Sequence, residues 1–393
     1  MPGQRGTSTT PEESLIANEP LEGATTSPVN QATSAVTTAA ERATSTIPQG
    51  QNSDREAADL PAVPQQPTTA IEADDGVASD DGYETGSESS SNASTSISSS
   101  IRDYNFENRR RYHKFKEGRY VFPNDEPEQE REDMKHCMVV GLCDGGLHNA
   151  PLRDPQKILD IGTGTGIWAI DMGDEYPEAE ITGIDLSPIQ PPFVPPNVRF
   201  LVDDVEAEWL YPENSLDYVH LRHMAPSIKD WPKLLKQAYK ALKPGGWVEI
   251  QEMLWVFDCD DGTMKSDYSP IKMTDLIKEG LAKFGVDVRA GASHGQRIEA
   301  AGFGDLIHAA KKVPVGTWPK NPDMKSIGDY CRAVLYDGLH AVTIGPLTRG
   351  LGWTAEEVEV FLVQVRRDLL DNSNHSYVYY HSYSGQKPLQ ETE

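Results

Sequence analysis

Short apolar runs recur through the middle of the chain and have the length and composition of β-strands. They are rich in Ile, Val and Leu and are separated by polar or glycine-containing segments, which is typical of buried strands. The predicted strands are KILDIG (157–162), EITGIDLS (180–187), VRFLVDD (198–204), LDYVHLRH (216–223) and WVEIQEM (247–253).

Amphipathic segments lie between these runs. GIWAIDMGDEYP (166–177) reads as a helix stopped by Pro177, and WPKLLKQAYKALKPGG (231–246) has apolar residues at helical spacing and ends at paired glycines. Strands that alternate with helices of this length predict an α/β fold with a doubly wound, mostly parallel sheet and right-handed crossovers. Ligands of such sheets bind beyond the carboxyl ends of the strands.

Further elements flank this core. Pro127 and the acids around it predict the first turn of a helix from Glu126 to about Leu142. Thr354 and Glu357 have the spacing of a capping box and begin another helix. The remaining predicted elements are helices over 269–285 and 295–302, a strand over 303–316, and a last strand over 376–388 that we expect to be antiparallel and at or near the edge.

The first hundred residues have a different composition. Ser, Thr, Ala, Pro and acidic residues dominate, and Tyr83 is the single aromatic residue. Such a segment cannot bury enough apolar surface to offset chain entropy. We therefore predict a disordered acidic tail over 1–103 and a folded domain over 104–393.

Charge and cysteine content limit the classes of function. The formal net charge is −25, which disfavours general binding to nucleic-acid backbones or anionic membranes. No apolar run approaches the roughly 20 residues that span a bilayer. The cysteines lack CxxC or metal-ligand spacing, so we expect reduced thiols, no bound metal and an intracellular location in cytoplasm, nucleus or both. The four cysteines are Cys137, Cys143, Cys259 and Cys331.

A glycine-rich turn follows the first predicted strand of the core. In IGTGTG, Gly162, Gly164 and Gly166 lie between that strand and its helix, where missing side chains let backbone amides approach a ligand. The nicotinamide fingerprint is GxGxxG, whereas this turn is GxGxG. The turn by itself therefore does not identify the ligand.

Acidic residues end the next two strands. Asp185 is placed to accept both hydroxyls of a ribose. Asp203 and Asp204 end the following strand, where one carboxylate can accept from an adenine amine while the Val205 amide contacts a ring nitrogen. Three successive strand ends thus offer partners for a methionine-like tail, a ribose and an adenine, which together describe S-adenosylmethionine.

These motifs resemble those of a known family. Segments 158–191, 200–209 (FLVDDVEAEW) and 241–252 (ALKPGGWVEIQE) resemble class I S-adenosylmethionine-dependent methyltransferases. NRRRYHKF, SPIQP, SIKDWPKLLKQAYKALKPGGW and YSGQKP narrow the resemblance to the LaeA-like methyltransferases of filamentous fungi, over residues 104–390.

The resemblance implies a seven-stranded sheet, S-adenosylmethionine as cofactor, and a role as a regulator of secondary metabolism or as a biosynthetic tailoring enzyme. The methyl acceptor, a small metabolite or a protein, stays open. It also implies an N-terminal helical lid (104–150), a cofactor-binding core (151–256) and substrate-side helices with the last strands (257–393).

Residue roles follow from the same resemblance. Asp160 and the three glycines would hold the methionine portion of the cofactor, Asp185 the ribose and Asp204 the adenine, while Tyr112 would cover the cofactor as a lid. The chemistry of methyl transfer, and not the resemblance, points to His223 at the end of the fourth strand as the best-placed base for an acceptor that carries a proton, since an aspartate is common at this position in the family. It is equally interpretable as a hydrogen-bonded polar residue at the rim of the sheet.

A basic cluster precedes the first helix. It can act as a nuclear-import sequence, as a patch for an acidic regulatory partner, or as a helix packed onto the domain, and we favour packing. If the patch and the tail recruit partners, the chain would be a cofactor-binding module of a nuclear regulatory complex with little turnover. The cluster consists of Arg109, Arg110, Arg111, Lys114, Lys116 and Arg119.

Overall fold

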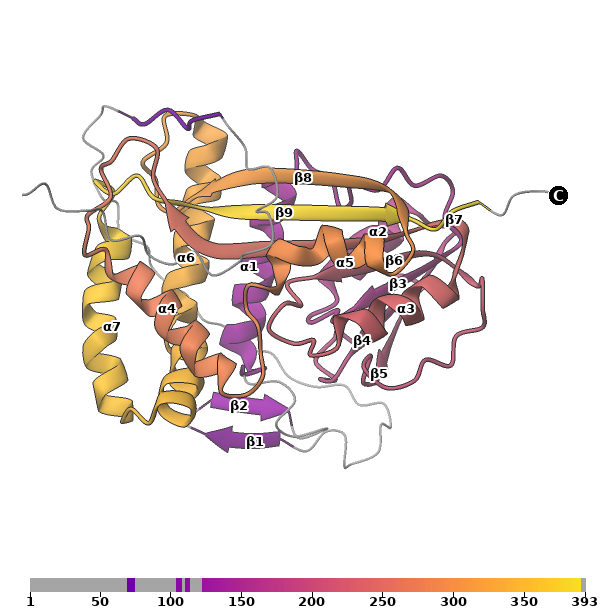
Figure 1. Cartoon of the computed structure of the whole chain (residues 1–393), viewed down its shortest axis with the longest axis horizontal. Coiled ribbons are helices and arrows are strands. Elements are labelled where there is room, and N and C mark those ends of the chain that lie inside the picture. Colours follow the sequence, from indigo (N-terminus) through magenta and orange to yellow (C-terminus); the bar gives the residue numbers. More distant parts are fainter. Residues whose placement is uncertain (1–68, 75–103, 108–109, 114–121, 390–393) are drawn as a thin grey trace, which may run out of the picture. The chain divides into compact units, whose positions relative to one another are not determined.

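A seven-stranded sheet lies at the centre of the part of the chain that the computed structural model describes, residues 69–74, 104–107, 110–113 and 122–389 (Figure 1). The strand order is β5-β4-β3-β6-β7-β9-β8. Strands β3 to β7 run parallel to one another, and β9 runs antiparallel between β7 and β8, which confirms the predicted α/β class. The strands are β3 (Lys157–Ile161), β4 (Glu180–Asp185), β5 (Val198–Val202), β6 (Leu216–Arg222), β7 (Leu242–Asp258), β8 (Gly304–Pro314) and β9 (Tyr377–Gln386).

The direction of winding reverses at the middle of the sheet. From β3 the chain proceeds outward through β4 to β5, and it then returns to β6 and proceeds to the other side through β7. The carboxyl ends of β3 and β6 therefore lie side by side with their connections leading in opposite directions. A crevice for a ligand forms at such a switch point.

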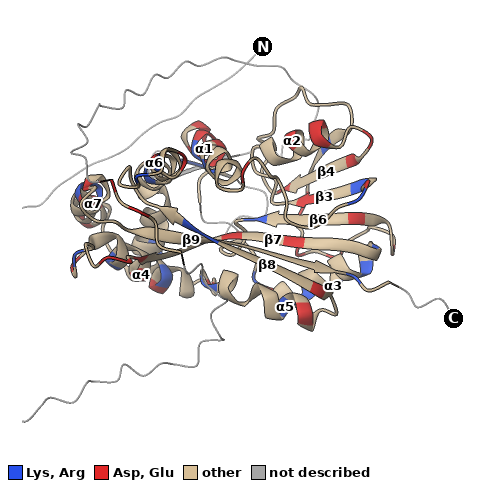
Figure 2. Cartoon of the chain, turned by 90° about the horizontal axis from the view of Figure 1, so that it is seen from above, with Lys and Arg blue, Asp and Glu red and all other residues tan. Residues whose placement is uncertain are grey.

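Helices cover both faces of the sheet, with α1, α2 and α6 on one side and α3, α4 and α5 on the other (Figure 2). Trp168 and Met172 of α2 pack on one face, and Leu234 and Leu235 of α3 pack on the opposite face. The α-helices are α1 (Glu126–Leu142), α2 (Ile167–Glu175), α3 (Trp231–Ala241), α4 (Ser269–Ala282), α5 (His294–Ala300), α6 (Pro322–Gly345) and α7 (Ala355–Leu370).

Helix ends follow the signals in the sequence. The Asp125 carboxylate caps α1 by accepting from the Glu128 N–H, and a proline occupies the first turn. At α7 the Thr354 hydroxyl accepts from the Glu357 N–H, and the Glu357 carboxylate accepts from the Thr354 N–H, so the predicted capping box is confirmed.

Several elements differ from expectation, among them α3, which ends at Ala241 rather than at the predicted paired glycines. β7 extends to Asp258, beyond the predicted end at residue 253, because it pairs with β9 along most of its length. The long helix α6 was not predicted, because its glycines weaken the helical pattern. Its glycines permit close packing: a Cβ on Gly328 would lie 2.1 Å from the Gly316 carbonyl oxygen, and one on Gly338 would lie 3.0 Å from Arg131.

The basic segment is extended where the structure describes it. Arg110–His113 form strand β2, antiparallel to β1 (Tyr104–Glu107), so the helix expected for these residues is wrong. The Asn124 N–H donates to the Arg111 carbonyl, which holds β2 extended beside the start of α1. The other basic residues of the cluster lie outside the described residues.

A short piece of the N-terminal region pairs with the folded domain. The Asp74 N–H donates to the Trp318 carbonyl, and the Lys320 N–H donates to the Glu72 carbonyl. Lys320 and Lys325 also form ion pairs with Glu72 and Asp74. Most of the predicted tail, including residues 1–68 and 75–103, lies outside the described residues, so its predicted disorder stays a prediction.

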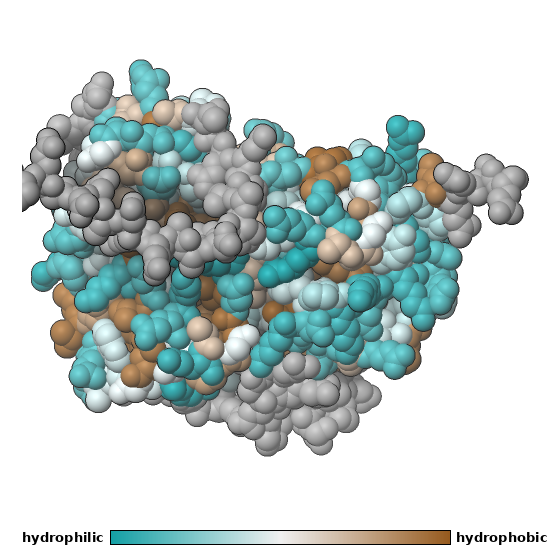
Figure 3. Space-filling view, viewed as in Figure 1, coloured by the Kyte–Doolittle hydropathy of each residue, from teal (hydrophilic) through white to brown (hydrophobic). Residues whose placement is uncertain are grey.

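The outer side of α7 carries apolar residues that are exposed, namely Val360, Val363 and Leu370, in the region where apolar side chains gather over α4 and α7 (Figure 3). Within the described ranges no helix has both the length and the apolar character that a membrane crossing requires.

Candidate active site

A cleft opens at the carboxyl ends of β3, β4, β5 and β6, where the winding reverses. The glycine turn after β3, the acidic ends of β4 and β5, the end of β6 and the first turns of α1 line it. A smaller inner pocket shares part of this lining and continues beneath the glycine turn to Asp160 and Trp168. The residues predicted from successive strand ends therefore meet around one cavity.

The three glycines of the turn all have positive φ, which favours glycine. A Cβ on Gly162 would lie 2.1 Å from the Met224 Sδ, and one on Gly166 would lie 2.4 Å from Phe200. A Cβ on Gly164 would meet no atom within 4 Å, and Gly164 lines the cleft. Two of the glycines thus make room for neighbouring protein side chains, while the third keeps the cavity open.

Asp185 links the glycine turn to the end of β4. Its Oδ2 accepts from the Gly164 N–H at 2.9 Å, and its Oδ1 accepts from the Ser187 N–H at 2.9 Å. Each carboxylate oxygen has a second lone pair, and the residue lines the cleft, so it can still accept two ligand hydroxyls. Burial raises the pKa of Asp185 to about 6.

Asp203, Asp204 and Val205 all line the cleft after β5. The Asp203 carboxylate accepts from the Asp204 N–H at 2.7 Å, and the Asp204 carboxylate accepts from the Glu206 N–H at 3.0 Å. Asp-to-backbone bonds of this kind fix the loop and the direction of its carboxylates. The loop therefore holds the predicted adenine partners at one side of the cleft.

Asp160 occupies the inner pocket at the end of β3. It is buried, and its Oδ1 accepts from the His220 Nδ1 at 2.8 Å, because an ionised carboxylate can only accept. The indole of Trp168 stacks on the His220 ring at a centroid distance of 3.6 Å. Packing and hydrogen bonding thus hold the Asp160 carboxylate in a fixed orientation beneath the glycine turn.

His223 lines both cavities at the end of β6 and has a φ of 58°. Its N–H donates to the Gln251 carbonyl at 2.8 Å, while its Nε2 has no hydrogen-bond partner among the described residues. Burial, together with the charges of Lys135 and Arg222, lowers the pKa of His223 well below its ordinary value. The imidazole is neutral at physiological pH and can accept a proton.

Glu252 lies within β7, is buried and does not line either cavity. Its Oε1 accepts from the Ala225 N–H at 2.6 Å, and the His294 ring lies 3.8 Å from the same oxygen. The Glu252 carboxylate therefore holds the loop that follows His223 without lining the cleft.

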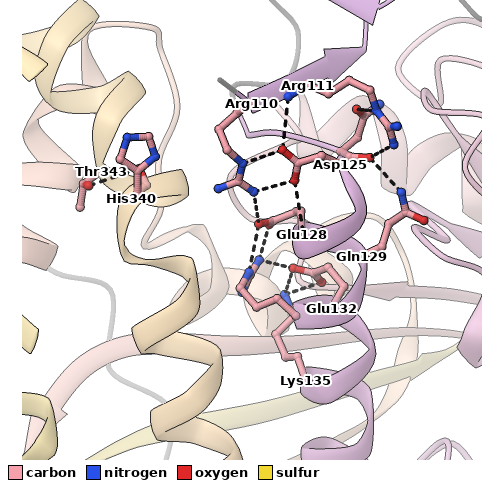
Figure 4. A network of polar contacts seen from close by, with 11 residues as sticks. Arg110, Arg111, Asp125, Glu128, Gln129, Glu132, Lys135, His340 and Thr343 are labelled. Atoms are coloured by element: carbon pink, nitrogen blue, oxygen red, sulfur yellow. Dashed lines mark hydrogen bonds and ion pairs between the residues drawn. The ribbon is translucent and has the colours of Figure 1, made fainter. Parts of the chain in front are cut away.

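One wall of the cleft comes from α1 and is built on a ladder of ion pairs (Figure 4). Burial alone would raise the pKa of Glu132, yet the charges of Lys135 and Arg131 lower it to about 2. The ladder places Glu128, Glu132 and Lys135 at the cavity. Its members are Arg110, Asp125, Glu128, Arg131, Glu132 and Lys135.

Tyr112 lies on β2 and is buried, but it is not among the residues that line the cleft; Pro123 and Asn124 line the cleft near the start of α1. The contact of Tyr112 with a cofactor stays a prediction.

The lining residues Glu128, Glu132 and Lys135 were not predicted from the sequence. The charges spaced three and four apart in EPEQEREDMK were a signal, because they place alternating charges on one helix face.

The cavity fits S-adenosylmethionine in charge and in polar partners. More carboxylates than cations line the cleft, which attracts a sulfonium ligand. Thr163 lines the inner pocket, and its hydroxyl is buried without a hydrogen-bond partner among the described residues. The charged lining residues are Glu128, Glu132, Lys135, Asp185, Asp203, Asp204, Glu206 and Arg222.

The sheet order, the glycine turn and the acids that follow it define a class I S-adenosylmethionine-dependent methyltransferase. Residues 134–281 match the methyltransferase-domain family. The methyltransferase pytC of Aspergillus terreus is 43% identical over 297 residues, covering 75% of this chain and 91% of the relative.

Two regulators are also similar. The secondary metabolism regulator LAE1 of Cochliobolus heterostrophus is 39% identical, with 72% of this chain and 95% of the relative covered. The secondary metabolism regulator laeA of Aspergillus fumigatus is 31% identical, with 72% and 76% covered. The chain belongs to the LaeA-like fungal methyltransferases, uses S-adenosylmethionine as its cofactor, and is linked to fungal secondary metabolism.

Proposed function

We propose that this methyltransferase acts on an oxygen atom of a small metabolite, with His223 as the base. The observation that carries the proposal is the neutral imidazole of His223, which lines both the cleft and the inner pocket. The residues at the strand ends hold the cofactor, and the mouth beside His223 holds the acceptor.

The cofactor supplies an already activated methyl group. The protein has to align the acceptor oxygen with the methyl carbon and sulfur and to exclude water. During transfer the O–CH3 bond would form and the S–CH3 bond of the cofactor would break, while the His223 imidazole would take the acceptor O–H proton. The products are the methylated metabolite and S-adenosylhomocysteine, and the imidazolium returns its proton to solvent.

The lowered pKa of His223 favours oxygen over nitrogen as the acceptor atom. An oxygen that is methylated while still protonated is a very strong acid, so even a weak base takes its proton. A methylated amine holds its proton far more tightly than an imidazole of lowered pKa.

The association of the family with secondary metabolism supports a small metabolite as substrate. An intracellular location, in the cytoplasm, the nucleus or both, is supported by the cysteines, since all four lie among the described residues and are free thiols. With a net charge of −25, the chain is not proposed to bind nucleic acid directly.

A second candidate function is a cofactor-binding module that joins regulatory protein partners and turns over slowly. Two of the relatives named above are regulators, which favours this candidate. Binding of the cofactor is common to both candidates, so binding by itself does not separate them.

One labelling experiment separates the candidates. Purified protein is incubated with methyl-labelled S-adenosylmethionine and a fungal extract, and Asp185→Ala and His223→Gln serve as comparison variants. We expect label in a small-molecule fraction with wild type, and a loss of at least about tenfold with each variant. Label confined to protein contradicts a metabolite acceptor, and tight cofactor binding without any labelled product favours the regulatory module.

A further inference from the structure

Arg222 is a partly buried cation whose charge is not balanced by a carboxylate. It ends β6 and lines both the cleft and the inner pocket. Its guanidinium donates a hydrogen bond to the His136 Nδ1 at 2.8 Å, and among the described residues no carboxylate oxygen lies within 4.0 Å of it. A buried charge without a counter-charge is costly, and an anionic ligand group would remove that cost.

The His136 ring orients this guanidinium. The His136 Nε2 lies 2.8 Å from the Asp171 Oδ2, and because an ionised carboxylate can only accept, the Nε2 carries the hydrogen. The Nδ1 then holds a lone pair and accepts from Arg222. Burial and the Arg222 charge lower the pKa of His136 to about 4, so the ring is neutral and leaves the arginine charge uncompensated.

The inner pocket also contains the opposite charge. Asp160 lines it and is held by His220, as described above. Asp160 and Arg222 influence each other electrostatically but do not form an ion pair within 4.0 Å. Two fixed, opposite charges in one pocket that do not touch each other are complementary to a zwitterion, with its ammonium toward Asp160 and its carboxylate toward Arg222.

We propose that Arg222, oriented by His136 and Asp171, binds the carboxylate of the methionine portion of S-adenosylmethionine. This inference rests on the cofactor assignment and adds a residue that the glycine turn and the acidic strand ends do not include. Lys135 is a poorer candidate, because its ammonium lies 2.6 Å from the Glu132 carboxylate.

The inference predicts a preference between two ligands. We would measure by calorimetry the affinity of the purified full chain for S-adenosylmethionine and for decarboxylated S-adenosylmethionine. The second ligand carries more net positive charge, which the acidic cleft favours, so the comparison works against the expected result. A charge-assisted hydrogen bond predicts that wild type binds the carboxylated ligand about 10- to 100-fold more tightly.

Substitution assigns the preference to the arginine. With Arg222→Met we expect S-adenosylmethionine to bind about 10- to 100-fold more weakly while the decarboxylated ligand keeps its affinity, so that the preference disappears. Asp171→Ala should reduce the preference without abolishing it, because it releases the His136 ring. Arg199→Met is the matched control, since Arg199 is an exposed arginine of β5 paired with Glu180 outside the cleft.

The outcomes separate the inference from the cofactor assignment. Equal affinities of wild type for the two ligands overturn the inference and do not depend on how any variant folds. A preference that survives in Arg222→Met overturns the role of the arginine, provided that near-UV circular dichroism shows a folded variant. Failure of wild type to bind either ligand overturns the cofactor assignment, and the inference with it.

Discussion

The raised pKa of Asp185 predicts that cofactor affinity falls in mild acid. In the folded protein without cofactor, burial raises the pKa of this carboxyl to about 6, above its ordinary value of 3.8. The protonated form is therefore favoured by folding. The stability that this group contributes is fully present below pH 3.8 and is lost as the pH rises through about 6.

Cofactor binding requires the ionised form of Asp185, whereas folding favours the protonated form. To accept both hydroxyl hydrogens of a ribose, the carboxylate must be ionised, because a protonated oxygen loses an acceptor position. With a pKa of about 6, the ionised fraction is nearly complete at about pH 7.5 and close to one tenth at about pH 5. The Kd for S-adenosylhomocysteine should therefore rise about tenfold over this interval, or ~1.4 kcal/mol.

Calorimetry of S-adenosylhomocysteine binding at constant ionic strength measures this slope. Asp185→Asn should bind about 10- to 100-fold more weakly at neutral pH and should lose the tenfold dependence, because its side chain does not titrate. Asp203→Asn lies in the same cleft and serves as the control that keeps the dependence. A wild-type affinity that does not change with pH, or a slope that persists in Asp185→Asn, would refute this reasoning.

Further predictions concern stability and the division of the chain. Gly162→Ala should lower the free energy of unfolding by about 1–3 kcal/mol, because its Cβ would meet Met224, and thermal denaturation measures this. Glu249→Ala should lower the free energy of unfolding, measured with denaturant, by about 3–5 kcal/mol. The reason is that this buried carboxylate accepts from the Asn149 and Ala150 N–H groups and from neighbouring side chains. An unchanged denaturation midpoint would contradict this. Removal of residues 1–68 should leave S-adenosylhomocysteine affinity unchanged in calorimetry, since the proposed contacts lie later; weaker binding by a folded truncation contradicts it.

The strands and most helices of the core could be predicted because local patterns determine them. Apolar runs between turn residues marked β3 to β6, and capping signals marked α1 and α7. The helix α6 could not be found in this way, because its glycines are explained only by neighbours distant in the sequence, such as the Gly316 carbonyl beside Gly328. Helix propensity read from the local sequence does not account for a glycine that is required by close packing against a distant segment.

The candidate site shows the same division. Asp185 and Gly164 could be predicted because they lie at strand ends, where the topology brings them together. Arg222 also ends a strand, but its importance depends on His136, which α1 contributes from 86 positions earlier in the chain. A pairing between elements so far apart leaves no trace in local periodicity, so the charged wall of the cleft appears only in the structure.

The way α1 completes the cleft affects how the protein can be divided. The match to the methyltransferase-domain family begins at residue 134, in the middle of α1. A fragment cut at that boundary would keep every strand of the central sheet but would lack Glu128 and Glu132, together with Asp125, which caps the helix. Expression of this protein for ligand studies should therefore begin before Arg110, whose guanidinium pairs with that capping aspartate.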